Sequence, residues 1–195
     1  VEIGGNKIYD GHGNHYLQNP NEIVDLIFFL KKYSKKKNLR KFLEIGFAAG
    51  VNTNFLNKFF NFENLVVVDI LSGGIDPFTF YANLRFKNIT LICGDTTKKE
   101  IQNKIKLSGP YDIIFIDGGH DYKTAKSDFM NFSKLVSKNG IIIFHDIMHC
   151  DVPKGHKGVP HLWSEIKKNK KKYISKEFYD NLPVTRTGIG VLIKK

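Results

Sequence analysis

The segment from Tyr111 to Tyr122, YDIIFIDGGHDY, joins a run of apolar residues to side chains that can do chemistry. The run is typical of a buried strand, and Asp117, two glycines, His120 and Asp121 follow it directly. A carboxylate can bind a metal ion, and histidine has an unperturbed pKa of about 6.5, which suits a general base near neutral pH. The segment therefore predicts reactive groups at the end of a strand.

Other apolar runs also carry an acid at or near their ends. Glu44 lies in the run KFLEIGF, Asp69 in NLVVVDI and Asp95 at the end of ITLICGD, while His145 and Asp146 lie near the end of GIIIFHDI. Any one of these acids could simply cap the helix that follows it. However, the carboxyl ends of parallel strands meet at one edge of a sheet, and such sheets bind ligands there. The shared position of these residues predicts one binding crevice.

Strands and helices are expected to alternate along the chain. The strands are near-continuous runs of Val, Ile, Leu and Phe, which are typical of parallel strands buried on both faces. The pattern predicts an α/β fold, a Rossmann-like doubly wound and mostly parallel seven-stranded sheet with helices on both faces and an antiparallel edge strand. The expected strands are 41–47, 64–70, 89–95, 111–118 and 140–147, with an antiparallel pair at 176–180 and 187–195. One helix is expected to begin at residue 21, and the other expected helices span 52–60, 76–86, 98–107, 122–139 and 161–173.

The 195 residues are expected to form a single domain. Within it, we expect 1–39 to form an N-terminal lid segment and helix, 40–147 a cofactor-binding core, and 148–195 a C-terminal helix and edge strands. No apolar run approaches the roughly 18 residues that cross a membrane, and the start lacks the features of a signal peptide. Cys93 and Cys150 do not make a disulfide framework. We therefore expect a cytoplasmic protein that does not enter a membrane.

A net charge of +11 raises the question of a polyanionic partner. Only three of the 30 basic residues, Arg40, Arg85 and Arg186, are arginine, which nucleic-acid readers favour for bidentate contacts. The lysine runs at 31–41 and 167–172 fit solvated helix ends. Nucleic acid is therefore an open alternative partner that the sequence does not favour.

The turn after the first strand helps to identify the ligand. A nicotinamide fingerprint reads G-x-G-x-x-G, whereas EIGFAAG reads E-x-G-x-x-x-G, with Glu44, Gly46 and Gly50. A carboxylate at that place suits an ammonium group and not a diphosphate. Asp69 suits the hydroxyls of a ribose, and Asp95 suits an exocyclic amine. An amino acid, a ribose and adenine together indicate S-adenosylmethionine.

The stretches FLEIGFAAG, VVVDI, LICGDTT and YDIIFIDGGHDY resemble, in order and spacing, the motifs of class I S-adenosylmethionine-dependent methyltransferases. The resemblance covers residues 40–147. IDGGHDY to FHDI, with GVPHLWSEIK and GIGVL, also resembles a small bacterial branch that includes macrocin-type sugar O-methyltransferases and cephalosporin-hydroxylase-like proteins. In many members a third glycine stands at the position of Ala48. The resemblance implies that the cofactor is held by Glu44, Gly46, Phe47, Ala48, Gly50, Asp69, Ile70, Gly94, Asp95, Thr96, Asp117 and Gly118.

The same resemblance implies a metal ion and a base. In metal-dependent O-methyltransferases of this family, the acid that ends the fourth strand binds Mg²⁺ and a base follows three residues later. Asp117 and His120 fall on these positions and are the catalytic candidates. The family's acidic pair after the fifth strand is His145 and Asp146 here, so the metal candidates are Asp117, His145 and Asp146. Mg²⁺ is the expected ion, but the histidine leaves Mn²⁺ or Fe²⁺ as alternatives.

The N-terminal segment YDGHGNHYLQN is expected to cover the crevice. Its residues Tyr9, His12, His15 and Tyr16, together with His149, are the candidate substrate contacts. The expected reaction is O-methylation of a small polar acceptor, such as a saccharide hydroxyl, with His120 as general base. The expected partner is that small-molecule acceptor, with a second copy of the chain in a homo-oligomer as an open question.

Two alternative functions stay open. The net charge could belong to an RNA methyltransferase, although the chain lacks the N/D-P-P-Y/F motif of amino-group methylation, and neither cysteine follows a proline. The second alternative is a non-methylating, hydroxylase-like protein of the same fold, in which Asp117, Asp146 and His145 would bind iron. Salt-dependent RNA binding would favour the first alternative. The identity of the bound metal would distinguish the second alternative from methyl transfer.

Overall fold

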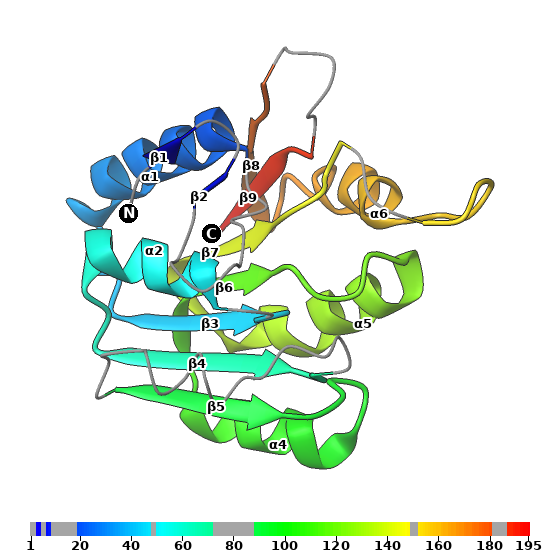
Figure 1. Cartoon of the computed structure of the whole chain (residues 1–195), viewed down its shortest axis with the longest axis horizontal. Coiled ribbons are helices and arrows are strands. Elements are labelled where there is room, and N and C mark those ends of the chain that lie inside the picture. The colour runs from blue at the N-terminus through cyan, green and yellow to red at the C-terminus, as the bar shows by residue number, and fades with distance from the viewer. Residues whose placement is uncertain are drawn as a thin grey trace.

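A seven-stranded sheet forms the centre of the protein (Figure 1). The computed structural model describes residues 3–4, 7–8, 19–47, 50–71, 88–148, 152–180 and 187–195. The strand order is β5-β4-β3-β6-β7-β9-β8. The strands are β3 (Lys41–Ile45), β4 (Asn64–Asp69), β5 (Ile89–Cys93), β6 (Tyr111–Ile116), β7 (Val136–Phe144), β8 (Tyr173–Phe178) and β9 (Ile189–Lys194). Two short strands, β1 (Ile3–Gly4) and β2 (Lys7–Ile8), form a separate antiparallel pair.

The five strands from β3 to β7 run parallel, and β9 pairs antiparallel with both β7 and β8. The parallel register aligns Glu44 of β3 with Val67 of β4 on one side and Phe115 of β6 on the other. The carboxyl ends of the parallel strands therefore meet at one edge of the sheet. The predicted fold class, a mostly parallel sheet with antiparallel edge strands, is confirmed.

Helices cover both faces of the sheet because alternate strand residues point to opposite sides. Phe42 belongs to a core cluster with residues of α1 and α2, whereas its neighbour Leu43 belongs to a second cluster with residues of α4, α5 and α6. Both side chains are fully buried, which explains why the strands read as continuous apolar runs. The helices are α1 (Pro20–Ser34), α2 (Val51–Phe60), α4 (Lys99–Ser108), α5 (Tyr122–Phe132) and α6 (Val159–Ile166).

Two predicted helices end earlier than expected. The helix predicted at 122–139 stops at Phe132, a short 3-10 helix η1 (Ser133–Leu135) follows, and β7 already begins at Val136. Asn139 has a left-handed φ of 59°, and the register of β6 against β7 shifts between Tyr111 and Ile113, so an irregular start of the strand was mistaken for a helix end.

The helix predicted at 161–173 lies at Val159–Ile166. Its predicted second half is a lysine-rich segment with mostly exposed side chains, and β8 begins at the buried Tyr173. The helix predicted at 76–86 lies outside the described residues. No helix in the described part of the chain has the length and apolar character that crossing a membrane requires.

Candidate active site

The carboxyl ends of β3, β4, β5 and β6 border a cavity of about 580 Å³. The predicted cofactor residues come together there in large part. Those that line the cavity are Gly46, Asp69, Ile70, Gly94, Asp95, Thr96, Asp117 and Gly118. Phe47 is instead buried in the core against α1 and α2, and Gly50 begins α2. Ala48 lies outside the described residues.

The turn after β3 needs glycine for steric reasons. Gly46 has a left-handed φ of 87°, and its N–H donates to the Val68 carbonyl oxygen at 2.9 Å. A Cβ atom at Gly46 would come within 1.9 Å of the backbone oxygen of Asp117. Gly50 also has a positive φ, 70°, at the start of α2. Gly46 thus lets the ends of β3, β4 and β6 come close together, and Gly50 starts α2.

Glu44, two residues before Gly46, fixes the start of α2 by hydrogen bonds. Its carboxylate is 1% exposed and accepts hydrogen bonds from Asn52 Nδ2 at 2.7 Å and from the Thr53 hydroxyl. Burial raises the pKa of Glu44 to about 8, against these two hydrogen bonds, and the charges of Asp117 and Asp69 add to the rise. Sequence reasoning did not anticipate this structural role.

The acids after β4 and β5 are held by local hydrogen bonds. Asp69 accepts from the Leu71 N–H through Oδ1 at 2.7 Å, and its backbone oxygen accepts from Gly94 N–H at 2.8 Å. Asp95 Oδ1 accepts from both the N–H and the hydroxyl of Thr97, at 2.8 and 2.7 Å. These bonds to Thr97 lower the pKa of Asp95. Both carboxylates therefore have fixed positions in the wall of the cavity.

A further part of the wall comes from α5, which sequence reasoning missed. Thr124 and Asp128 of α5 line the cavity, and Asp128 is buried. The signal was present in the sequence, because Asp128 lies within the apolar face of an amphipathic helix, between Ala125 and Phe132. A charged residue in such a face is unusual unless it has a partner.

Beside the cavity, the chain forms an acid–histidine group. Asp117, His120 and Asp146 each offer a ligand atom, and these atoms lie within 4.8 Å of one another. His120 Nε2 lies 3.2 Å from Asp146 Oδ2. Asp146 follows β7 in a left-handed conformation, with φ 59°, which non-glycine residues adopt uncommonly and aspartate adopts more readily than most.

His145 faces the same two carboxylates. Its Nδ1 lies 3.3 Å from Asp117 Oδ1 and 3.2 Å from Asp146 Oδ1, and its Nε2 is buried without a hydrogen-bond partner in the described chain. Burial alone would lower the pKa of His145, but the carboxylates of Asp117 and Asp146 outweigh burial and raise it. In this arrangement His145 orients the two acids by hydrogen bonding.

The donor set fits a divalent cation. Two carboxylates supply the oxygen ligands that Mg²⁺ prefers, and one imidazole suits Mn²⁺ and Fe²⁺ as well. The separation of the ligand atoms is close to what a shared ion requires, since metal–ligand distances are near 2.0–2.2 Å. The predicted substrate residues Tyr9, His12, His15, Tyr16 and His149 all lie outside the described residues.

The order of the strands, the glycine turn and the acids at the strand ends are those of a class I S-adenosylmethionine-dependent methyltransferase. A family model described as a methyltransferase domain matches residues 43–147. This match covers more than half of the 195 residues, and the chain belongs to this methyltransferase family. The search of curated protein sequences found no match.

Several solved structures share the fold. An O-methyltransferase from Bacillus cereus in complex with S-adenosylhomocysteine is similar at a TM-score of 0.67 and 19% identity, over 91% of this chain and 82% of that one. TomG from Streptomyces achromogenes, an O-methyltransferase of tomaymycin synthesis in complex with S-adenosylmethionine, is similar at a TM-score of 0.69 and 15% identity, over 92% of this chain and 82% of that one. MycE, a methyltransferase of mycinamycin biosynthesis in complex with Mg, S-adenosylhomocysteine and mycinamycin VI, is similar at a TM-score of 0.59 and 16% identity. That last match covers 89% of this chain and 53% of MycE.

Proposed function

We propose that the protein transfers a methyl group from S-adenosylmethionine to a hydroxyl of a small polar acceptor, such as a saccharide, with the help of a divalent metal ion. One observation carries the proposal: Asp117 lines the cavity and also belongs to the acid–histidine group. A methyl donor in the cavity would therefore lie next to groups that can bind and deprotonate an acceptor. The O-methyltransferases among the similar structures support the same reaction class.

The cavity residues divide among the parts of the cofactor. The turn at Gly46 and Gly50 would face the methionine portion, and Asp69 would accept hydrogen bonds from the ribose hydroxyls. Gly94 and Asp95 would border the adenine. Glu44, buried next to the turn, would act on the methionine portion through the position that its hydrogen bonds give to the start of α2.

Asp117 and Asp146 would hold the metal ion, with Mg²⁺ the first candidate and Mn²⁺ or Fe²⁺ the alternatives. When bound, such an ion lowers the pKa of a coordinated hydroxyl and orients it. His145, the third predicted ligand, donates from Nδ1 and steadies both carboxylates.

His120 would be the general base. With its Nε2–H donating to Asp146 Oδ2, the basic atom of the imidazole is Nδ1, which would take the acceptor's proton. S-adenosylmethionine would supply the methyl group: the acceptor oxygen would form the new bond to the methyl carbon, and the sulfonium, as its carbon–sulfur bond breaks, would become a neutral thioether, so that charge and atoms balance. The His120 side chain is 38% exposed, which allows an acceptor to reach it.

The test is a calorimetric titration with S-adenosylhomocysteine, followed by a methyl-transfer assay on a panel of saccharides and glycosylated compounds. We expect micromolar binding, near −8 kcal/mol as an order of magnitude. We also expect transfer that stops with EDTA and returns with Mg²⁺. Failure of folded, cofactor-free protein to bind S-adenosylhomocysteine would overturn the cofactor assignment. Transfer that continues in EDTA would overturn the role of the metal.

A further inference from the structure

Asp128 places a carboxyl group in the wall of the cavity with one oxygen unused. Asp128 is 1% exposed and lines the cavity together with Thr124, one turn earlier on α5, and Thr96. Its Oδ1 atom is buried and has no hydrogen-bond partner among the residues that the structure describes. A buried carboxyl oxygen without a partner destabilises a fold, and each such group in a native protein calls for an explanation, such as a functional role or a bound water or ion. The location beside a ligand cavity points to a donor on the ligand.

The surroundings of Asp128 contain acids and hydroxyls. None of the salt bridges formed by the described residues includes Asp128. Burial raises its pKa to about 6, a hydrogen bond from the Thr96 side chain lowers it, and the charges of Asp95 and Asp121 raise it further. The carboxyl thus lacks a cationic partner, and a neutral N–H or O–H donor from a ligand would stabilise it.

The position within the cavity selects the donor. S-adenosylmethionine carries three kinds of donor: the ammonium group, the ribose hydroxyls and the 6-amino group of adenine. The turn at Gly46 and the carboxylate of Asp69 are the proposed contacts of the first two. Asp128 is hydrogen-bonded to the side chain of Thr96, in the loop after β5 that also carries Asp95. The 6-amino group is the donor that remains for this part of the wall.

Asp95 was the acid that the sequence predicted for this amine. In the structure, Asp95 Oδ1 already accepts two hydrogen bonds from Thr97, which is the arrangement of a turn-forming aspartate. Asp128, in contrast, has a buried oxygen that is not engaged in the described chain. The charge of Asp95 acts on Asp128, so the two acids lie near each other, and Asp128 is the one whose hydrogen bonding is incomplete in the described chain.

We propose that Asp128 accepts a hydrogen bond from the 6-amino group of the cofactor's adenine and makes the site selective for a 6-aminopurine over a 6-oxopurine. This inference rests on the proposed S-adenosylmethionine site. A 6-oxopurine would bring a carbonyl oxygen to the Asp128 carboxylate, and two acceptors repel each other. Asparagine at this position could turn its amide and donate to the 6-oxo group.

The experiment compares two ligands, S-adenosylhomocysteine and its 6-oxo analogue S-inosylhomocysteine, by calorimetry at pH 8. We expect the wild type to bind the adenine compound about 10- to 100-fold more tightly, as for loss of a hydrogen bond to a charged group. Asp128→Asn should bring the two affinities within about threefold of each other. Asp121→Asn, which removes a nearby charge at the exposed start of α5, is the matched control and should keep the wild-type ratio.

The outcomes separate this inference from the proposed function. A wild type that binds neither ligand overturns the cofactor site itself. If the wild type shows the expected preference and Asp128→Asn retains it, the role of Asp128 is overturned. If Asp95→Asn loses the preference instead, the selectivity belongs to Asp95. The ratio of two affinities in one protein does not change if part of the sample is unfolded. If Asp128→Asn does not fold at all, Asp128→Ala must also lose the preference.

A structural role for Asp128 predicts a different pattern. In that case Asp128→Asn would lower the melting temperature of the ligand-free protein and weaken both ligands equally. A ligand-binding role predicts a melting temperature at pH 8 that is equal to or above that of the wild type, because the substitution removes a buried charge with incomplete hydrogen bonding. Thermal unfolding of the ligand-free variants distinguishes the two.

Discussion

At the scale of single residues, His120 is the side chain on which the proposed chemistry depends most. It lies after β6, with Nε2 3.2 Å from Asp146 Oδ2. We expect His120→Gln to reduce methyl transfer by about 10²- to 10⁴-fold, the usual contribution of a general base. The affinity for S-adenosylhomocysteine should stay unchanged. His156→Gln, in an exposed loop, is the control, and more than a tenth of wild-type transfer in His120→Gln would contradict the role.

A substitution at Asp146 tests the metal site separately from the cofactor site. Its left-handed φ of 59° is a conformation that asparagine adopts as readily as aspartate, so Asp146→Asn should fold normally. We expect the variant to bind Mn²⁺ at least about 10-fold more weakly than the wild type, because one carboxylate ligand is lost. Electron paramagnetic resonance of added Mn²⁺ measures this directly. An unchanged Mn²⁺ affinity would remove Asp146 from the ligand set.

Which residues meet at the site could be predicted in part from the sequence. Asp69, Asp95 and Asp117 follow apolar runs, and parallel strands bring their ends together, so their common location follows from strand spacing alone. The arrangement of His145 against two carboxylates could not be predicted, because it depends on side-chain rotamers and on the left-handed backbone at Asp146.

At the scale of elements, the junction of β3 and α2 should give the protein a pH-dependent stability. Burial raises the pKa of Glu44 to about 8, so the folded state holds this proton more tightly than the unfolded state, whose carboxyl has a pKa of 4.5. The contribution of Glu44 to stability is therefore fully present below pH 4.5 and is lost as the pH rises through about 8. The free energy of unfolding should fall across this range.

Glu44→Gln should remove that part of the pH dependence. The amide is neutral at all pH values and can still hydrogen-bond to Asn52 and Thr53. At pH 8 we expect the variant to melt about 2–4 °C higher than the wild type, as for about 1 kcal/mol in a protein of this size. Thermal scans from pH 5 to pH 8 measure the effect. A variant that is less stable at pH 8, with the wild-type slope retained, would show that Glu44 is ionised in the fold.

The close approach of β3 to β6 leads to a second prediction about the elements, which concerns stability. Gly46 and Gly155 have nearly the same left-handed φ, 87° and 85°, but a Cβ at Gly46 would overlap the Asp117 backbone, whereas one at Gly155 would have nothing within 4 Å. We expect Gly155→Ala to cost about 1 kcal/mol and Gly46→Ala at least about 3 kcal/mol. Urea unfolding of the two variants separates backbone strain from steric overlap. Equal losses would mean that the strand ends can move apart.

The existence of the elements was easier to predict than their ends. The apolar runs identified each parallel strand, because burial on both faces demands them. The start of β7 was missed because Ser137 to Asn139 are polar and resemble a helix end, although they already belong to the strand. Boundaries of this kind depend on pairing with a neighbour, which a single segment of sequence does not contain.

At the scale of the whole molecule, the strand order could be expected only in outline. Alternating strands and helices imply a parallel sheet, and the terminal segments were expected to form an antiparallel pair at its edge. The position of β9 between β7 and β8 follows from pairings such as Ile143 with Val191, which no local pattern encodes.

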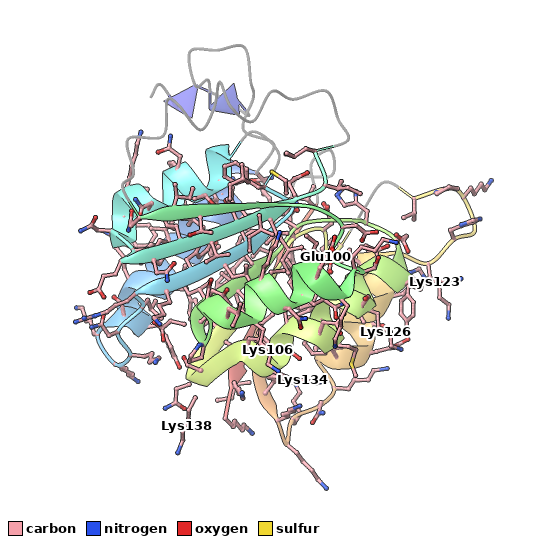
Figure 2. All side chains as sticks on the ribbon, turned by 90° about the horizontal axis from the view of Figure 1, so that it is seen from below. Glu100, Lys106, Lys123, Lys126, Lys134 and Lys138 are labelled. Carbon is pink, nitrogen blue, oxygen red and sulfur yellow. The ribbon has the colours of Figure 1, made fainter. Side chains whose placement is uncertain are left out.

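The distribution of charge over the molecule leads to the last prediction. Exposed lysines lie over α4, α5, η1 and the start of β7, among them Lys106, Lys123, Lys126, Lys134 and Lys138 (Figure 2). Carboxylates, in contrast, gather in the cavity. The lysines are dispersed over several elements, and lysine presents a point charge without the planar fork that reads bases. Contacts of this kind attract phosphates without selecting a sequence.

We therefore expect the protein to bind single-stranded RNA only weakly, with a dissociation constant of about 10⁻⁶ M or higher at 0.15 M salt and a steep loss of affinity as salt increases. Fluorescence anisotropy of labelled oligonucleotides of different sequence measures both properties. The affinity for S-adenosylhomocysteine, determined with and without saturating RNA, serves as the control and should not change. Tight binding that depends on sequence, or that strengthens cofactor binding, would favour RNA as the methyl acceptor, because a true acceptor occupies the site beside the methyl donor and is thermodynamically linked to it.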